Sequence, residues 1–96
     1  MTKENAMLHL MDRAGMIEYG RQLDERANGI FCGCGGDREI HLTQEGFRQV
    51  SEALQAITTF NPNWSERYNK TEAYFFTELL GKEYKVFALL SKGVQE

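Results

Sequence analysis

The run TEAYFFTELLGKEYKVFALL, residues 71–90, constrains the fold more than any other part of the chain. Its aromatic and β-branched residues favour β-strands. Gly81-Lys82 suits a two-residue hairpin turn with glycine first. The cross-strand pairs of that register are Glu78 with Lys85, Phe76 with Phe87, Thr77 with Val86, and Leu79 with Tyr84. An opposite-charge pair and an aromatic pair stabilise such a hairpin, so we predict one here.

Both faces of this hairpin carry apolar side chains, which means that both need cover. One face holds Tyr74, Phe76, Phe87 and Leu89, and the other holds Phe75, Leu79, Val86 and Leu90. Helices can cover one face, and the other is left for a loop or for a partner. A helix is the alternative for this run, because several of its apolar residues also fit helical spacing.

Two helices are predicted elsewhere in the chain. The first follows Thr2 and stops at Asn28-Gly29, with an apolar stripe at Met7, Leu10, Met11, Ala14, Ile17 and Leu23. Gly15 makes two shorter helices an alternative, because glycine weakens a helix interior. Thr43 caps the second helix, whose apolar stripe is Phe47, Val50, Leu54 and Ile57. It is expected to end at 58–61, ahead of Pro62, and 61–70 reads as a loop with one helical turn.

The stretch IFCGCGGDREIHLT, residues 30–43, predicts a second hairpin. A three-residue turn at 35–37 places Ile30, Cys32, Ile40 and Leu42 on a buried face and His41 outside, and we prefer this register. A two-residue turn at 36–37 would instead bring Cys32 opposite His41. These elements together predict one α+β domain over residues 1–96, with two helices on a small antiparallel sheet of two hairpins, in the order α-ββ-α-ββ. A mostly helical fold with one hairpin is the alternative.

Cys32, Cys34 and His41 are the residues that most resemble a chemical site. They would provide three ligands for a metal ion, yet their spacing matches no common zinc motif. A thiol nucleophile at Cys32 would need the less favoured register and a low thiol pKa. Buried cysteines more often serve as small core residues. We therefore predict no cofactor, no metal and no catalysis, and keep a metal- or thiol-dependent site as the alternative function.

Charge argues against several other classes of function. The net charge is −3 and no segment forms a basic stripe, so binding to a nucleic-acid backbone is not expected. A winged-helix nucleic-acid binder stays a third alternative, although Arg48 lies between Glu45 and Glu52 on the second helix. No apolar run is long enough to span a membrane. Two cysteines and no export signal favour the cytoplasm with free thiols.

Aromatic residues crowd the second half of the chain and suggest a partner-binding surface. The predicted set is Trp64, Tyr68, Tyr74, Phe76, Tyr84 and Phe87. Rings of this kind often anchor protein interfaces, and they also complete the cores of small domains. The sequence thus favours a small, soluble, non-catalytic protein-interaction module, a regulator or inhibitor that covers a partner's surface. Its partner would be another protein, with a homodimer as the simplest version.

Overall fold

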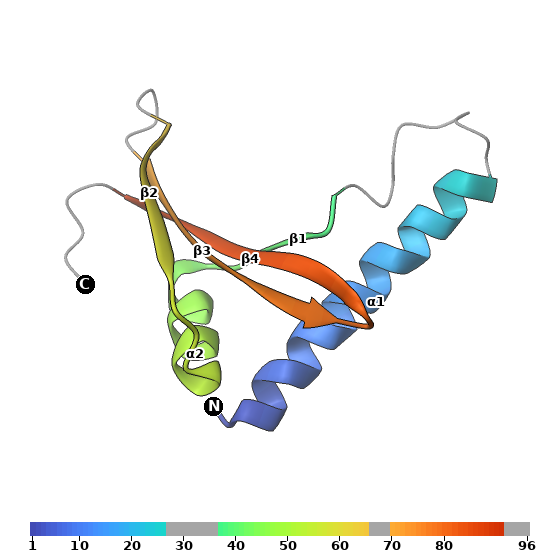
Figure 1. The fold of residues 1–96 in the computed structure, drawn as a ribbon, viewed down its shortest axis with the longest axis horizontal. Coiled ribbons are helices and arrows are strands. Elements are labelled where there is room, and N and C mark those ends of the chain that lie inside the picture. The colour runs from blue at the N-terminus through green and yellow to red at the C-terminus, as the bar shows by residue number, and fades with distance from the viewer. Residues whose placement is uncertain (27–36, 66–69, 92–96) are drawn as a thin grey trace.

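A computed structural model of the chain describes residues 1–26, 37–65 and 70–91. Its elements are α1 (Lys3–Arg26), β1 (Glu39–His41), α2 (Gln44–Leu54), β2 (Thr59–Ser65), β3 (Lys70–Leu79) and β4 (Lys82–Ser91). The strands form one four-stranded sheet in the order β1-β4-β3-β2 (Figure 1). The α+β class is confirmed, with three strands in a row after α2.

The sheet is mixed, which corrects the prediction of an antiparallel sheet built from two hairpins. β1 pairs in parallel with β4, while the β2–β3 and β3–β4 pairs are antiparallel. The Lys85 amide donates to the Arg38 carbonyl at 3.0 Å, and the Leu42 amide donates to the Phe87 carbonyl at 2.9 Å. The expected strand at residues 30–34 lies outside the described residues. A parallel partner follows from tertiary packing: Ile40 fills a buried position beside Val86, at the edge of β4 that β3 leaves open.

The β3–β4 hairpin is confirmed, but its turn lies one residue earlier than predicted. Leu80 and Gly81 both have positive φ, 55° and 75°, as a type I′ turn requires. Each residue therefore faces a partner two positions away from the predicted one, for example Phe76 opposite Lys85. A shift of two keeps every side chain on its predicted face. The left-handed Leu80 is tolerated because this register places Phe75 opposite Val86 and Ala73 opposite Ala88.

β2 occupies part of the segment predicted to be a loop with a helical turn. It pairs with β3 from Thr59 opposite Tyr74 onward, and its register shifts between Asn61 and Ser65. Pro62 lies at that irregularity. Proline has no N–H for a ladder and is tolerated on edge strands or at bulges, which is its position here. Pairing with the long edge of β3 thus outweighed the local preference of this segment for a loop with a helical turn.

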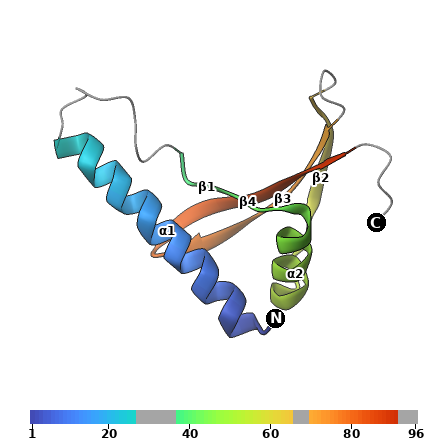
Figure 2. The same cartoon turned by 180° about the vertical axis from the view of Figure 1, so that it is seen from behind.

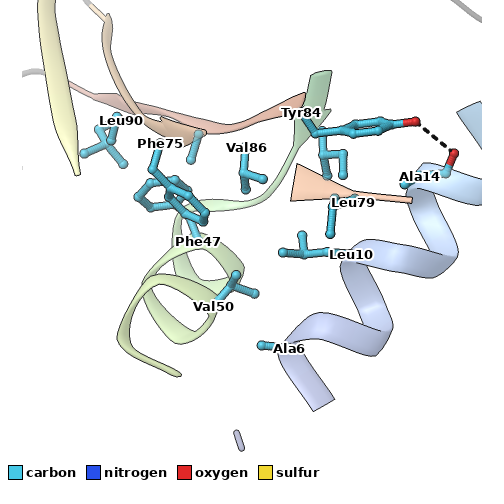
Figure 3. Close-up of a cluster of buried hydrophobic side chains, with 13 residues drawn as sticks. Ala6, Leu10, Ala14, Phe47, Val50, Phe75, Leu79, Tyr84, Val86 and Leu90 are labelled. Carbon is cyan, nitrogen blue, oxygen red and sulfur yellow. Dashed lines mark hydrogen bonds between the residues drawn. The ribbon is translucent and has the colours of Figure 1, made fainter. Parts of the chain in front are cut away.

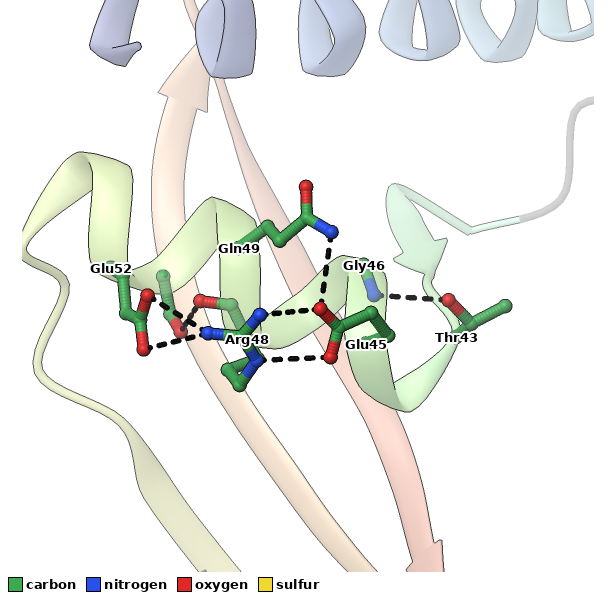
Figure 4. Close-up of polar contacts among 7 residues, drawn as sticks. Thr43, Glu45, Gly46, Arg48, Gln49 and Glu52 are labelled. Carbon is green, nitrogen blue, oxygen red and sulfur yellow. Dashed lines mark hydrogen bonds and ion pairs between the residues drawn. The ribbon is translucent and has the colours of Figure 1, made fainter. Parts of the chain in front are cut away.

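Both helices start as predicted, and α2 ends earlier. α1 is continuous through Gly15, so the broken-helix alternative is not observed. The Thr43 hydroxyl caps α2 by accepting from the Gly46 amide at 3.0 Å (Figure 4). α2 stops at Leu54 because Gln55 adopts the left-handed conformation, with its amide donating to the Glu52 carbonyl. Ile57, expected on the buried stripe, lies beyond the helix and is 91% exposed.

The core lies between the helices and one face of the sheet. Figures 1 and 2 show both helices on the same side of the strands. Leu10 from α1 and Phe47 from α2 meet Phe75, Val86 and their neighbours there (Figure 3). The Phe47 and Phe75 rings pack with centroids 5.6 Å apart. Ala73 and Ala88 are fully buried opposite each other, which lets the helices approach the strands closely.

A polar cluster at the edge of this core joins α1 to β1 and β4. Arg38 donates to both carboxylate oxygens of Glu18, at 2.8 and 3.2 Å. The Tyr84 hydroxyl contacts the same carboxylate and lies 3.2 Å from the Ala14 carbonyl oxygen. Hydrogen bonds from Arg38 and Tyr84 lower the pKa of Glu18 to about 2. Burial and the Glu18 contact raise the pKa of Tyr84 to about 12.

Candidate partner-binding surface

The sheet face that points away from both helices is the candidate site, and we name it the open face. Side chains alternate along a strand, so even-numbered residues of β3 and odd-numbered residues of β4 share this face. The pairs along it, starting from the turn, are Glu78–Glu83, Phe76–Lys85, Tyr74–Phe87, Glu72–Leu89 and Lys70–Ser91. The outer strand β1 adds Glu39 and His41 beside Lys85 and Phe87.

Two aromatic pairs lie across the middle of the open face, and the strand pairing of Tyr74 with Phe87 places them next to each other. His41 stacks on Phe87 with ring centroids 4.7 Å apart and planes 5° apart. Tyr74 meets Phe76 edge-on at 5.8 Å. Phe76 is 55% exposed, whereas its chain neighbour Phe75 is 5% exposed. The open face thus presents a large ring to solvent at one end of an ordered aromatic group.

Lys85 runs along the open face and is held by a buried carboxylate. Its ammonium lies 2.8 Å from the Glu72 carboxylate, and the Glu72 side chain is only 6% exposed. On the way it passes over the rings of Tyr74 and Phe87, at 4.8 and 5.6 Å from their centroids. A cation over an aromatic face is attracted by the ring quadrupole. This charge is therefore paired within the fold.

The turn end of the open face carries two carboxylates directly opposite each other. Glu78 pairs with Glu83 across the hairpin, and both are exposed. Like charges in directly opposite positions destabilise a hairpin. The predicted register would have placed Lys85 against Glu78 and hidden this feature. The next pair along the same face contains Phe76, so an exposed ring and a repelling acidic pair are adjacent.

The structure divides the predicted partner-binding residues. Tyr74, Phe76 and Phe87 come together on the open face. Tyr84 is fully buried on the helix-covered face and has no surface to offer. Trp64 belongs to β2 by its backbone, but its side chain, like all of Tyr68, lies outside the described residues.

Sequence reasoning missed Lys85, Glu72 and the Glu78–Glu83 pair as parts of the surface. The sequence signal for them was the alternation of side chains between the two faces of β3 and β4. That alternation predicts the cross-strand pairs only when the position of the turn is also known.

The residues proposed for the alternative sites are only partly described. His41 lies on the exposed side of β1, and Ile40 is buried. Cys32 and Cys34 lie outside the described residues. Within residues 1–26, 37–65 and 70–91, no group of three or more His, Cys, Asp or Glu side chains could hold a metal ion. None of the helices described is long and apolar enough to cross a membrane.

The outer surface of α2 is engaged in ion pairs. Arg48 donates through Nε to Glu45 at 2.9 Å and through Nη1 to Glu52 at 3.1 Å (Figure 4). Hydrogen bonds from Arg48 and Gln49 lower the pKa of Glu45 to about 2. The predicted mixture of charges on this helix is therefore present as a closed network. A hollow of about 120 Å³ lies between α2 and β2, lined by Phe47, Phe60, Leu90 and other residues.

Comparison with known proteins assigns no family or function to the chain. No family model, no curated protein and no solved structure matches the chain.

Proposed function

We propose that this protein is a small non-catalytic interaction module that binds another protein through the open face. The partner contributes a segment with an apolar or aromatic side chain next to lysine or arginine. By covering that segment, the protein acts as a regulator or inhibitor. A chain with only two cysteines suits a reducing compartment, so the cytoplasm is its proposed location.

The observation that carries this proposal is the exposure of Phe76 beside ordered rings. Phe76 is 55% exposed although it stands in the central hairpin of the sheet. Tyr74 packs edge-on against it, so its surroundings are already aromatic. Interface hot spots are often aromatic residues whose neighbours are rigid before binding. A partner's apolar side chain placed over Phe76 would bury that ring with little loss of conformational entropy.

Charge decides which apolar segment suits the surface. Glu78 and Glu83 repel each other beside Phe76, and a partner's cation between them would relieve the repulsion. The chain's net charge of −3 steers a basic partner toward it. Lys85 is occupied by Glu72 and so offers little to an acidic partner. The surface therefore favours an apolar segment followed by basic residues.

Binding fits this surface better than catalysis. The ionisable groups at its centre, Lys85 and Glu72, are paired with each other at 2.8 Å. The one histidine on it, His41, is stacked on Phe87. Catalysis needs a nucleophile and a base that converge on one reacting atom. A face whose central charges, Lys85 and Glu72, are already paired with each other is better suited to contact.

Selection from a phage-displayed library of random peptides tests the proposal. The protein is immobilised, and enriched peptides are expected to combine an aromatic or large aliphatic residue with nearby lysine or arginine. Their binding should weaken roughly tenfold or more in Phe76→Ser, because an aromatic hot spot is lost. Ile57→Ser is the matched control, since Ile57 is a 91% exposed apolar residue in the link between α2 and β2 and not on β3 or β4.

Two results would overturn the proposal. One is a library that yields no enriched sequence. The other is a set of peptides that binds Phe76→Ser as well as the unchanged protein, which would place the binding surface elsewhere.

A further inference from the structure

α1 carries a second apolar stripe on the side that faces away from the core. Leu8, Met16 and Tyr19 are 57%, 65% and 57% exposed, and Leu23 is 38% exposed. The core side of the same helix holds the buried Ala6, Leu10 and Ala14. A helix that is apolar on both sides is usually covered on both sides. In Figures 1 and 2 the C-terminal half of α1 extends past the β3–β4 hairpin.

The outer residues of α1 form one narrow surface. At about 3.6 residues per turn, the members of this surface fall within an arc of about 100°. They are Leu8, Asp12, Gly15, Met16, Tyr19 and Leu23, and we name them the outer stripe. An arc of this width is the usual size of a helix face that packs on another element. The stripe is thus shaped for one further helix.

We propose that the outer stripe pairs with the outer stripe of a second copy of this chain, with the two helices antiparallel. The interface is distinct from the open face, so the proposal goes beyond partner binding. A two-fold axis between Gly15 and Met16 defines the arrangement. Such an isologous contact requires a surface that is complementary to itself.

The outer stripe has this self-complementarity. Leu8 and Leu23 are equally far in sequence from the axis, so each meets the other across the pair. Asp12 and Tyr19 are also equally far from it, so the Tyr19 hydroxyl can donate to the Asp12 carboxylate of the second copy. This gives the one acidic group on the stripe a partner.

Charges at the helix ends support the antiparallel direction. Glu4 lies in the first turn of α1 and Arg26 in its last turn. Both are exposed. At about 3.6 residues per turn, Arg26 lies within the arc of the outer stripe and Glu4 lies just outside it. Antiparallel pairing places each Glu4 near an Arg26 of the second copy, whereas parallel pairing would place like charges together.

Gly15 supplies an independent observation. A methyl group added at this position would meet nothing within 4 Å among the described residues, so their packing does not require glycine. Glycine in the middle of a helix is nonetheless unfavourable relative to alanine. Next to the two-fold axis it gives Met16 of the second copy room to approach the backbone. Small residues at helix crossings allow this closeness.

Sedimentation equilibrium of the purified chain tests the pairing. The expected mass is twice the 11.0 kDa of the chain at micromolar concentration. Tyr19→Lys should raise the dimer dissociation constant roughly 100-fold, because each dimer loses two aromatic anchors. Ile57→Lys makes the same kind of change at another exposed apolar residue and should leave the constant unchanged. Circular dichroism verifies that both variants remain folded.

Disulfide trapping tests the direction of the helices, in a chain with Cys32→Ser and Cys34→Ser. Under a copper oxidant, Met16→Cys should link to its own copy near the axis. Leu8→Cys should link to Leu23→Cys in a mixture but not to itself. Monomeric protein at high micromolar concentration would overturn the proposal. So would a dimer that survives Tyr19→Lys and is lost in Phe76→Lys, or efficient linkage of Leu8→Cys to itself.

Discussion

Phe75 and Phe76 are neighbours in β3 with identical side chains, yet they stand in opposite environments. Phe75 is 5% exposed and packs on Phe47 of α2, whereas Phe76 is 55% exposed on the open face. The covered face combines rings with alanines so that two helices can approach. The open face places rings where no element of the described fold needs them. The contrast separates residues that hold the fold from residues that are available to a partner.

Charged groups differ between the two faces in the same way. On the covered face, Glu18, Arg38 and Tyr84 join elements that are far apart in the sequence. On the open face, Glu72 and Lys85 pair within the β3–β4 hairpin. The first cluster therefore fixes the position of α1 on the sheet. The second joins two neighbouring strands to each other and involves no other element of the described fold.

The largest expected effect compares the two phenylalanines directly. Phe75→Ala should lower the free energy of unfolding by about 3–5 kcal/mol, because it leaves a cavity between α2 and the sheet. Phe76→Ala should cost about 1 kcal/mol or less, since half of its ring already faces water. Urea unfolding of both variants measures the difference. Equal losses would mean that the open face is covered in the folded chain, and the contrast between the faces would fail.

The ion pair of the open face should give the next largest effect. Lys85→Met removes the partner of a nearly buried carboxylate, so we expect a loss of about 2–3 kcal/mol. Adding Glu72→Leu should recover most of that loss, because no buried carboxylate is then left without a partner. A double-mutant cycle by urea unfolding measures the coupling. A loss below about 0.5 kcal/mol for Lys85→Met would show that the pair is solvated.

Much of this contrast could be predicted from the sequence. Alternation assigns Phe75 and Val86 to one face and Tyr74 and Phe87 to the other, and the structure agrees. The faces were predicted correctly although the turn was placed one residue too late, because a shift of two in the pairing keeps each side chain on its face. The predicted cross-strand pairs were wrong. The local preference for a turn at Gly81-Lys82 is outweighed by the packing of the observed register, which requires the left-handed conformation of Leu80.

Other parts depend on contacts that sequence patterns do not reveal. The parallel pairing of β1 with β4 joins segments far apart in the chain, with α2 between them in sequence. β2 forms despite Pro62 because β3 has a long free edge. The outer stripe of α1 was not predicted, because Leu23 was counted with the core-facing residues. At about 3.6 residues per turn, Leu23 lies on the side of the helix away from Leu10, and it is 38% exposed. Knowing which of the two sides is buried still requires the position of the sheet.

The polar cluster of the covered face should show itself in the pH dependence of stability. The pKa of Tyr84 is raised from 10.0 to about 12 in the fold, so its contribution is complete below pH 10 and lost as the pH rises toward 12. The pKa of Glu18 is lowered from 4.5 to about 2, so its contribution is present above pH 4.5 and lost as the pH falls.

Tyr84→Phe tests the alkaline side of this dependence. It should cost about 1–2 kcal/mol at pH 7 through the lost hydrogen bond. It should also remove part of the decline in stability between pH 10 and 12. Urea unfolding across this range measures both. Tyr74→Phe is the control, because it removes a hydroxyl from the open face. The cluster would lose its assigned role if both variants changed the pH profile equally.

The smallest expected effect on stability is a gain. It comes from the Glu78–Glu83 pair, which is expected both to lower stability and to bind a partner's cation. Glu83→Lys replaces two opposed carboxylates by an opposite-charge pair, so stability should rise by about 0.5 kcal/mol at low salt. The same change should weaken basic peptides roughly tenfold, since their cation loses its site between Glu78 and Glu83. Glu25→Lys on α1 makes the same change in net charge without an opposed glutamate, and should alter neither property appreciably. Thermal unfolding and peptide titration at low and high salt measure the two changes. Glu83→Lys could also stabilise the chain while peptides bind equally well. The acidic pair would then lower the stability of the fold without contributing to peptide binding, and the open face would not select basic residues.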